Sequence, residues 1–131
     1  MIENDEDDRL LTQESFEKEW PAAVIEFVSG LELQHRLEET DNRPQLILLS
    51  MNPRPYNAVG LIGQMRNVKG YGSTPIVVLS ESALPEEIRK CYSAGASSFI
   101  QKPSTYSEAL SKIKAFIAYW SQTVELPALA G

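Results

Sequence analysis

The sequence has 131 residues, of which 43% are hydrophobic, and its formal net charge at pH 7 is -6. This length fits one domain with one hydrophobic core, and the negative charge argues against nucleic-acid binding through a basic surface. No apolar run approaches the roughly 20 residues that span a bilayer, no signal-peptide pattern is present, and a single cysteine, Cys91, excludes an internal disulfide. We therefore expect a cytoplasmic protein whose partners are other proteins or small ligands.

The chain starts with an acidic run that precedes a helical pattern over residues 8–19. Such a run is typical of a loop that joins a strand to a helix, because carboxylates stabilise a helix N-terminus. Only Met1 and Ile2 precede it, so we expect the strand at this place to be truncated. The next predicted elements are a strand at 24–28 (VIEFV) and a helix at 31–39.

Two apolar runs in the middle of the chain, 46–49 (LILL) and 75–79 (PIVVL), lack polar alternation. This pattern predicts strands that are covered on both faces, as in a parallel sheet between helices. A helical pattern at 58–67 separates the two runs. A further helix is predicted to begin at Pro85 and to end before Gly95.

Residues 98–101 (SFIQ) form the last predicted strand. The segment 104–120 places apolar residues at spacings of three and four, which predicts an amphipathic helix. Strands that alternate with helices favour a doubly wound α/β domain. We expect this domain to cover residues 1–121 and residues 122–131 to form a loose tail.

Polar side chains follow the predicted strands, where ligands of open parallel sheets bind. A carboxylate cluster, hydroxyls and a lysine at such an edge are the groups that phosphoryl transfer with Mg²⁺ would use. The nucleophile is missing from this set. The residues collected at this edge are Ser50, Asn52, Ser80, Glu81, Gln101 and Lys102, together with the acidic loop at 3–8.

With these residues in place, the chain resembles the receiver domain of bacterial two-component response regulators over nearly all of residues 2–120. The motif NDEDDRLL is similar to the family's acidic loop, LILLSMN to its third strand, PIVVLSES to its fourth, and SAGASSFIQKP to its fifth strand with a Lys-Pro pair. The resemblance implies a flavodoxin-like, five-stranded parallel sheet in the order 2-1-3-4-5, with the first strand truncated in this chain.

The resemblance assigns roles to three residues that this chain retains. Lys102 corresponds to the lysine that pairs with the phosphoryl group, Ser80 to the switch hydroxyl and Phe99 to the switch aromatic. A plainer interpretation is that Ser80 and Phe99 are core and cap residues. In the same interpretation, Lys102 is a relic cation that Glu3 satisfies.

Two of the family's three acidic positions are changed. Ser50 stands where the family has the aspartate that accepts the phosphoryl group, and Glu3 with Asn4 stands for the paired acids that hold Mg²⁺. One carboxylate with carbonyls and water binds Mg²⁺ weakly, so we expect no cofactor and weak or absent Mg²⁺ binding. The acidic loop has a second interpretation as a solvated, helix-capping cluster. The loop NPRPYNAVG also departs from the family, because it holds two prolines.

A serine nucleophile needs an adjacent base. The single histidine, His35, falls in the second predicted helix, so we interpret Ser50 as structural and predict no enzyme activity. The alternative from the enzyme class is a phosphoryl-handling protein that uses Ser50. Cys91 is interpreted as a buried helix residue rather than a reactive thiol.

These observations predict a degenerate receiver domain that acts in signal transduction through phosphorylation-independent protein–protein interaction. The expected partners are signalling proteins, either a histidine kinase or a downstream regulator, with a homodimer as a further alternative and neither nucleic acid nor membrane. The resemblance places the interaction face on the fourth helix, fifth strand and fifth helix. The alternative is an atypical receiver that a ligand or another modification still switches at the degenerate pocket. The face would use aromatic and cationic side chains, namely Arg89, Tyr92, Phe99 and Tyr106.

The first strand is central in this fold, between the second and the third. Truncation would leave backbone donors of both neighbours unpaired, at roughly 1–3 kcal/mol for each buried unsatisfied group. We therefore expect a polypeptide segment to fill this slot, either upstream residues of the gene product or a segment of another chain.

Overall fold

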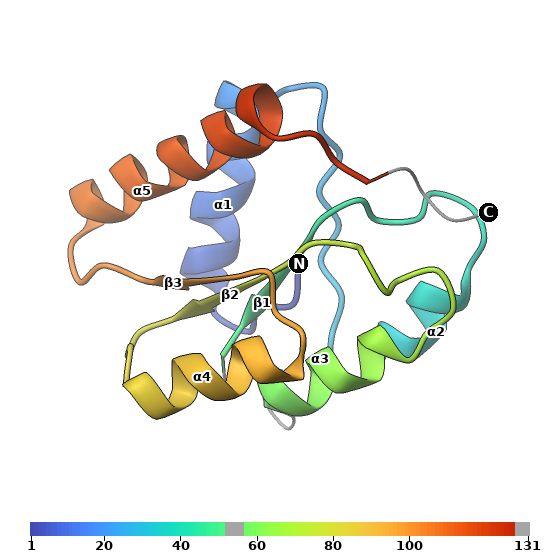
Figure 1. The fold of residues 1–131 in the computed structure, drawn as a ribbon. Helices are drawn as coiled ribbons and strands as arrows, with labels where there is room; N and C mark the ends of the chain where they lie inside the picture. Colours follow the sequence, from blue (N-terminus) through green and yellow to red (C-terminus); the bar gives the residue numbers. More distant parts are fainter. Residues whose placement is uncertain (52–56, 128–131) are drawn as a thin grey trace.

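The computed structural model describes residues 1–51 and 57–127. Within these ranges the helices lie on both faces of a central sheet, so that the fold has three layers (Figure 1). In chain order the elements are α1 (Glu6–Glu19), α2 (Leu33–Glu38), β1 (Ile47–Ser50), α3 (Ala58–Arg66), β2 (Ile76–Ser80), α4 (Pro85–Ala94), β3 (Ser98–Gln101), α5 (Tyr106–Ala118) and a π-helical turn, η1 (Tyr119–Thr123).

The three strands form a parallel sheet in the order β1-β2-β3. Ile47 lies opposite Ile76, and Val77 lies opposite Ser98. Helices α1 and α5 cover one face of the sheet, and α3 and α4 cover the other (Figure 1). The predicted α/β class with helices on both faces is therefore confirmed.

Alternate residues of each strand contribute to the two halves of the core. Ile47 and Leu49 of β1 belong to the cluster under α2, α3 and α4. Leu48, between them, belongs to the cluster under α1 and α5 together with Phe16 and Ile117. Burial on both faces explains why the strand sequences are aliphatic without polar alternation.

The predicted strand at 24–28 is wrong, because the structure assigns no strand there. Its backbone nevertheless lies beside Met1, whose ammonium donates to the Glu26 carbonyl at 2.7 Å and whose carbonyl accepts from the Val28 amide at 3.1 Å. Ile2 forms a single parallel bridge to β1. A regular strand needs successive residue pairs, and Met1 supplies only one. The five-stranded order therefore stays a prediction, although hydrogen bonds place Met1 and Ile2 between this segment and β1.

Helix α4 begins at Pro85 and ends before Gly95, as predicted. Gly95 has φ of 119°, a conformation that L side chains rarely adopt. The Arg66 guanidinium from α3 donates to the Gly95 carbonyl at 3.0 and 2.6 Å and to the carbonyls of Tyr71 and Thr74 at 2.7 Å each. Burial lowers the pKa of Arg66. This arginine therefore ties α3 to the turn between α4 and β3.

The end of the chain continues past α5 in the turn η1, which reaches Thr123. This turn crosses the predicted domain end at residue 121, and the division into domain and tail stays a prediction. Residues 128–131 and most of the proline-containing loop, 52–56, lie outside the described residues. No helix within 1–51 and 57–127 is long and apolar enough to cross a membrane.

Candidate functional site

The carboxyl ends of the strands bring the predicted polar residues to one edge of the sheet. Ser50 ends β1, Ser80 ends β2 and Gln101 ends β3, where it lies opposite Ser80. The Lys102 amide then donates to the Ser80 carbonyl at 2.6 Å. Asn52, also predicted at this edge, lies outside the described residues.

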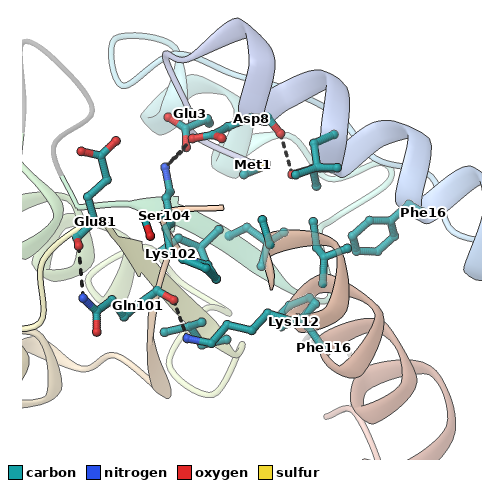
Figure 2. A pocket seen from close by; sticks show the side chains of 18 residues that line it. Met1, Glu3, Asp8, Phe16, Glu81, Gln101, Lys102, Ser104, Lys112 and Phe116 are labelled. Atoms are coloured by element: carbon teal, nitrogen blue, oxygen red, sulfur yellow. Dashed lines mark hydrogen bonds and ion pairs between the residues drawn. The ribbon is translucent and has the colours of Figure 1, made fainter. Parts of the chain in front are cut away.

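An ion cluster of Glu3, Asp8 and Lys102 forms the centre of this edge (Figure 2). The Lys102 Nζ lies 2.5 Å from Glu3 Oε1 and 2.9 Å from Asp8 Oδ2. The side chains of Lys102 and Glu3 are 18% and 4% exposed. Burial is the largest single influence and lowers the pKa of Lys102, but hydrogen bonds and charge attraction from Asp8 and Glu3 together outweigh it and raise that pKa. Lys102 is therefore held as a cation.

The arrangement of acids differs from the predicted pair of Glu3 and Asn4. Glu3 faces Asp8 across the Lys102 ammonium, while Asp5 caps α1 by accepting from the Asp8 amide at 2.9 Å. A divalent cation would have to displace the ammonium from both carboxylates, so these donors do not fit a resident Mg²⁺. Among the described residues, no group of three or more His, Cys, Asp or Glu could hold a metal ion.

Ser80, Phe99 and Ser50 each take part in a hydrogen bond with another part of the chain. Ser80 is buried, and its Oγ accepts from the Ser82 amide at 3.3 Å. Phe99 is half-buried against the core, and its amide donates to the Tyr92 hydroxyl at 3.2 Å. Ser50 is half-buried, and its amide donates to the Ile2 carbonyl at 2.9 Å. The roles that resemblance assigns to Ser50, Ser80 and Phe99 stay predictions.

A cavity of about 370 Å³ opens beside the ion cluster, between α1 and α5 (Figure 2). Its walls are mainly apolar and include Phe16 and Phe116. Lys112 lines the cavity and donates to the Gln101 carbonyl at 2.6 Å. Lys112 has no counterpart among the sequence-derived site residues. Its spacing within the helical pattern, ten residues after Lys102, is too common to single it out.

The two remaining candidates for chemistry lie away from the ion cluster. His35 is in α2, which packs against α3, and it does not line the cavity between α1 and α5. Cys91 is fully buried in α4, with its Sγ 3.6 Å from Met51 Sδ. Burial raises the pKa of the Cys91 thiol, and Glu87 raises it further. The prediction of a buried helix cysteine is confirmed.

The surface of α4, β3 and the start of α5 exposes the predicted aromatic side chains. Tyr92 is 47% exposed and Tyr106 is 68% exposed. Arg89 is also exposed and pairs with Glu86 at 2.5 Å. Tyr106 therefore does not cover the core, whereas half-buried Phe99 packs against it.

Comparisons with known proteins agree with this architecture. The family model described as response regulator receiver domain matches residues 1–114. The sensory/regulatory protein RpfC of Xanthomonas campestris pv. campestris is 33% identical over 66 residues, which are 49% of this chain and 9% of that protein. The chain thus spans a small part of this curated relative.

Solved structures resemble the chain over nearly its whole length. The phosphorylated cyanobacterial phytochrome response regulator RcpA has a TM-score of 0.87 at 25% identity, covering 97% of this chain and 95% of that chain. A response regulator receiver domain from Rhodospirillum rubrum has a TM-score of 0.86 at 23% identity, covering 100% of this chain and 97% of that chain. These likenesses support the flavodoxin-like fold.

Proposed function

The chain belongs to the family of response regulator receiver domains, and on that premise we propose that it is a degenerate receiver that signals through protein contacts independent of phosphorylation. The observation that carries this proposal is the position of Ser50 at the carboxyl end of β1. A hydroxyl there offers no carboxylate to a phosphodonor.

The surroundings of Ser50 support an inert hydroxyl. Serine becomes a nucleophile through an adjacent base, and His35 belongs to α2, not to this edge. Lys102, which would neutralise a bound phosphoryl group, already contacts Glu3 and Asp8. A phosphoryl group would therefore compete with two carboxylates for the same ammonium. We infer that the protein has no enzyme activity of its own.

The surface that remains able to recognise a partner is the aromatic face, defined as Arg89, Tyr92, Phe99 and Tyr106. Interface centres are enriched in tyrosine and arginine, and Tyr92 and Tyr106 present much of their surface to solvent. A signalling protein, either a histidine kinase or a downstream regulator, is the proposed partner. The likeness to the sensory/regulatory protein RpfC supports this class, and a homodimer through the same face is the alternative.

Partner capture and sedimentation of purified variants test this face. Tyr106→Ala is expected to weaken association at least tenfold, since anchor residues contribute about 2 kcal/mol or more. Tyr119→Ala is the matched control, because Tyr119 is equally a large exposed aromatic but lies in η1. Ser50→Ala should leave association unchanged. Loss of association in Ser50→Ala, with Tyr106→Ala still binding, would mean that recognition uses the degenerate pocket.

One observation favours the second candidate, a receiver switched by a small ligand. The cavity between α1 and α5 has apolar walls and places Lys102 and Lys112 on its lining, which suits a small amphipathic acid. A panel of such acids can be screened by NMR against the protein and against Ala109→Leu, which adds bulk to the cavity lining. Binding that Ala109→Leu abolishes would support the ligand switch, and no binding would leave the aromatic face as the site of function.

A further inference from the structure

The sheet face under α1 and α5 is incompletely covered toward the carboxyl ends of the strands. In β2, the middle strand of the described sheet, Val77 and Val78 point to opposite faces and both are fully buried. Leu79 points to the same face as Val77 but is only half-buried, and so is Ile100, its partner in β3. Aliphatic strands of a parallel sheet are ordinarily covered on both faces. Apolar surface is therefore left open between α1 and α5.

The cavity between α1 and α5 has this open surface on its lining. Leu79 and Ile100 line it together with Phe16 of α1 and with Ile113 and Phe116 of α5. Apolar walls offer no hydrogen bonds to water, so they favour an aliphatic chain as the occupant. The volume of about 370 Å³ lies near the lower end of the roughly 300–1,000 Å³ of ligand pockets. A chain of medium length is the occupant that this volume suits.

The polar side chains of the cavity gather toward one end (Figure 2). Gln101, Lys102 and the ammonium of Lys112 lie at that end, whereas Phe16 lies at the other (Figure 2). A ligand that matches this division has a single polar head and an apolar chain.

The two lysines of the polar end differ in what they already bind. Lys102 is used by Glu3 and Asp8, at 2.5 and 2.9 Å. Lys112 donates to the Gln101 carbonyl at 2.6 Å, and within the described part of the chain no carboxylate lies within 4 Å of its Nζ. An ammonium has three donors, so Lys112 can bind a carboxylate and keep its bond to Gln101. Lys112 is therefore the anchor that the cavity offers to an acid.

A cationic head is the competing choice, because Glu81 also lines the cavity. The Glu81 side chain is exposed to solvent, where water and salt screen its charge. A cation at the polar end would also lie near the ammonium groups of Lys102 and Lys112. These charges favour a carboxylate head over an amine.

We propose that the cavity between α1 and α5 binds a medium-chain aliphatic monocarboxylate, with its carboxylate on the Lys112 ammonium and its chain across Leu79 and Ile100 toward Phe16. For the role of the bound acid, this proposal rests on the second candidate function, a receiver switched by a small ligand. Recognition through the aromatic face does not depend on it, because no residue of that face lines the cavity.

Calorimetric titration of the full chain with octanoate, octanol and octylamine tests the head group. Octanoate should bind with a dissociation constant below about 1 mM. It should bind at least about tenfold tighter than octanol or octylamine, because only the acid can form a charge-assisted hydrogen bond with Lys112. No binding of octanoate at millimolar concentration, equal binding of acid and alcohol, or tighter binding of the amine would overturn the proposal.

A pair of lysine variants tests the anchor. Lys112→Gln removes the charge and should weaken octanoate binding at least about tenfold, while octanol binding stays unchanged. Lys114→Gln is the matched control, because Lys114 is in the same helix but does not line the cavity, and it should bind octanoate as the parent protein does. Equal effects of the two substitutions, or a Lys112→Gln variant that still prefers the acid, would contradict the assignment of Lys112.

Methyl NMR locates the bound chain. Octanoate should shift the methyl signals of Leu79 and Ile113 and leave those of Val78, which belongs to the core on the other face of the sheet, unchanged. Shifts at Val78 without shifts at Leu79 would place the acid elsewhere and refute the proposal. Partner association with and without octanoate is measured separately. If octanoate binds through Lys112 but association does not change, the ligand assignment stands and the ligand-switched function fails.

Discussion

Replacing Lys102 with methionine should destabilise the protein, because it leaves the Glu3 carboxylate buried without its cation. The Glu3 side chain is 4% exposed and loses a contact of 2.5 Å, whereas the more exposed Asp8 can turn to water. Removing one partner of a buried ion pair costs about 3–5 kcal/mol. Methionine keeps most of the aliphatic part of the lysine side chain, so the loss of stability measures the effect of removing the charge. We expect the free energy of unfolding to fall by about 3–5 kcal/mol, a large share of the roughly 5–15 kcal/mol of a typical domain.

Urea denaturation followed by circular dichroism measures this loss as a lower midpoint at an unchanged slope. Glu3→Gln combined with Lys102→Met should recover most of it, and Lys112→Met, an exposed lysine, should change stability by less than about 1 kcal/mol. Because the pKa of Lys102 is raised on folding, the contribution of the pair is fully present below the ordinary lysine pKa and is lost as the pH rises through the raised value. At neutral pH the deficit should therefore not vary. A Lys102→Met variant as stable as Lys112→Met would refute the reasoning.

Three further predictions follow from the same contacts. The double variant Ser50→Asp with Asn4→Asp should bind Mg²⁺ at millimolar concentration in calorimetry. Ser50→Asp alone should bind Mg²⁺ poorly, since one added acid must compete with Lys102. No binding by the double variant would mean that a Mg²⁺ site cannot be rebuilt at this edge of the sheet. Gly95→Ala should lower the free energy of unfolding by about 1–2 kcal/mol, because φ is 119° and the new Cβ would lie 3.0 Å from the Arg66 side chain. Gly63→Ala, whose Cβ meets nothing within 4 Å, should raise the free energy of unfolding by up to about 1 kcal/mol. Equal effects of the two substitutions in thermal melts would contradict this prediction. Cys91 should react with a thiol reagent at pH 8 only as fast as the protein opens, because the thiol is buried and its pKa is raised, and rapid labelling of the folded protein would count against it.

The pairing of Lys102 with Glu3 could be predicted from the sequence. Both residues follow predicted strand positions at one sheet edge, so charge and topology bring them together. The contribution of Asp8 could not be singled out, because four other acids lie in the same run. Which of them points toward Lys102 depends on the phase of α1, and that phase is fixed by the Asp5 cap.

The strand predicted at 24–28 shows that local composition does not determine whether a segment finds a neighbouring strand to pair with. The segment has the aliphatic and aromatic residues of a strand, but a strand requires a neighbour that pairs along its length, and here only Met1 bonds to the segment, at Glu26 and Val28. Arg66 is a similar case. Its partners are loop carbonyls of Tyr71, Thr74 and Gly95, whose positions are set by the packing of α3 against α4. No spacing of residues in the sequence predicts these contacts between Arg66 and loop carbonyls.

Intact-mass analysis after incubation with acetyl phosphate and Mg²⁺, with Ser50→Asp as the comparison, tests phosphorylation-independent function most directly. We expect no added phosphoryl group on the protein, and unchanged association through the aromatic face in the presence of the phosphodonor. The reason is that Ser50 presents a hydroxyl without an adjacent base. One stable phosphoryl group localised to Ser50, together with a change in association, would contradict phosphorylation-independent function.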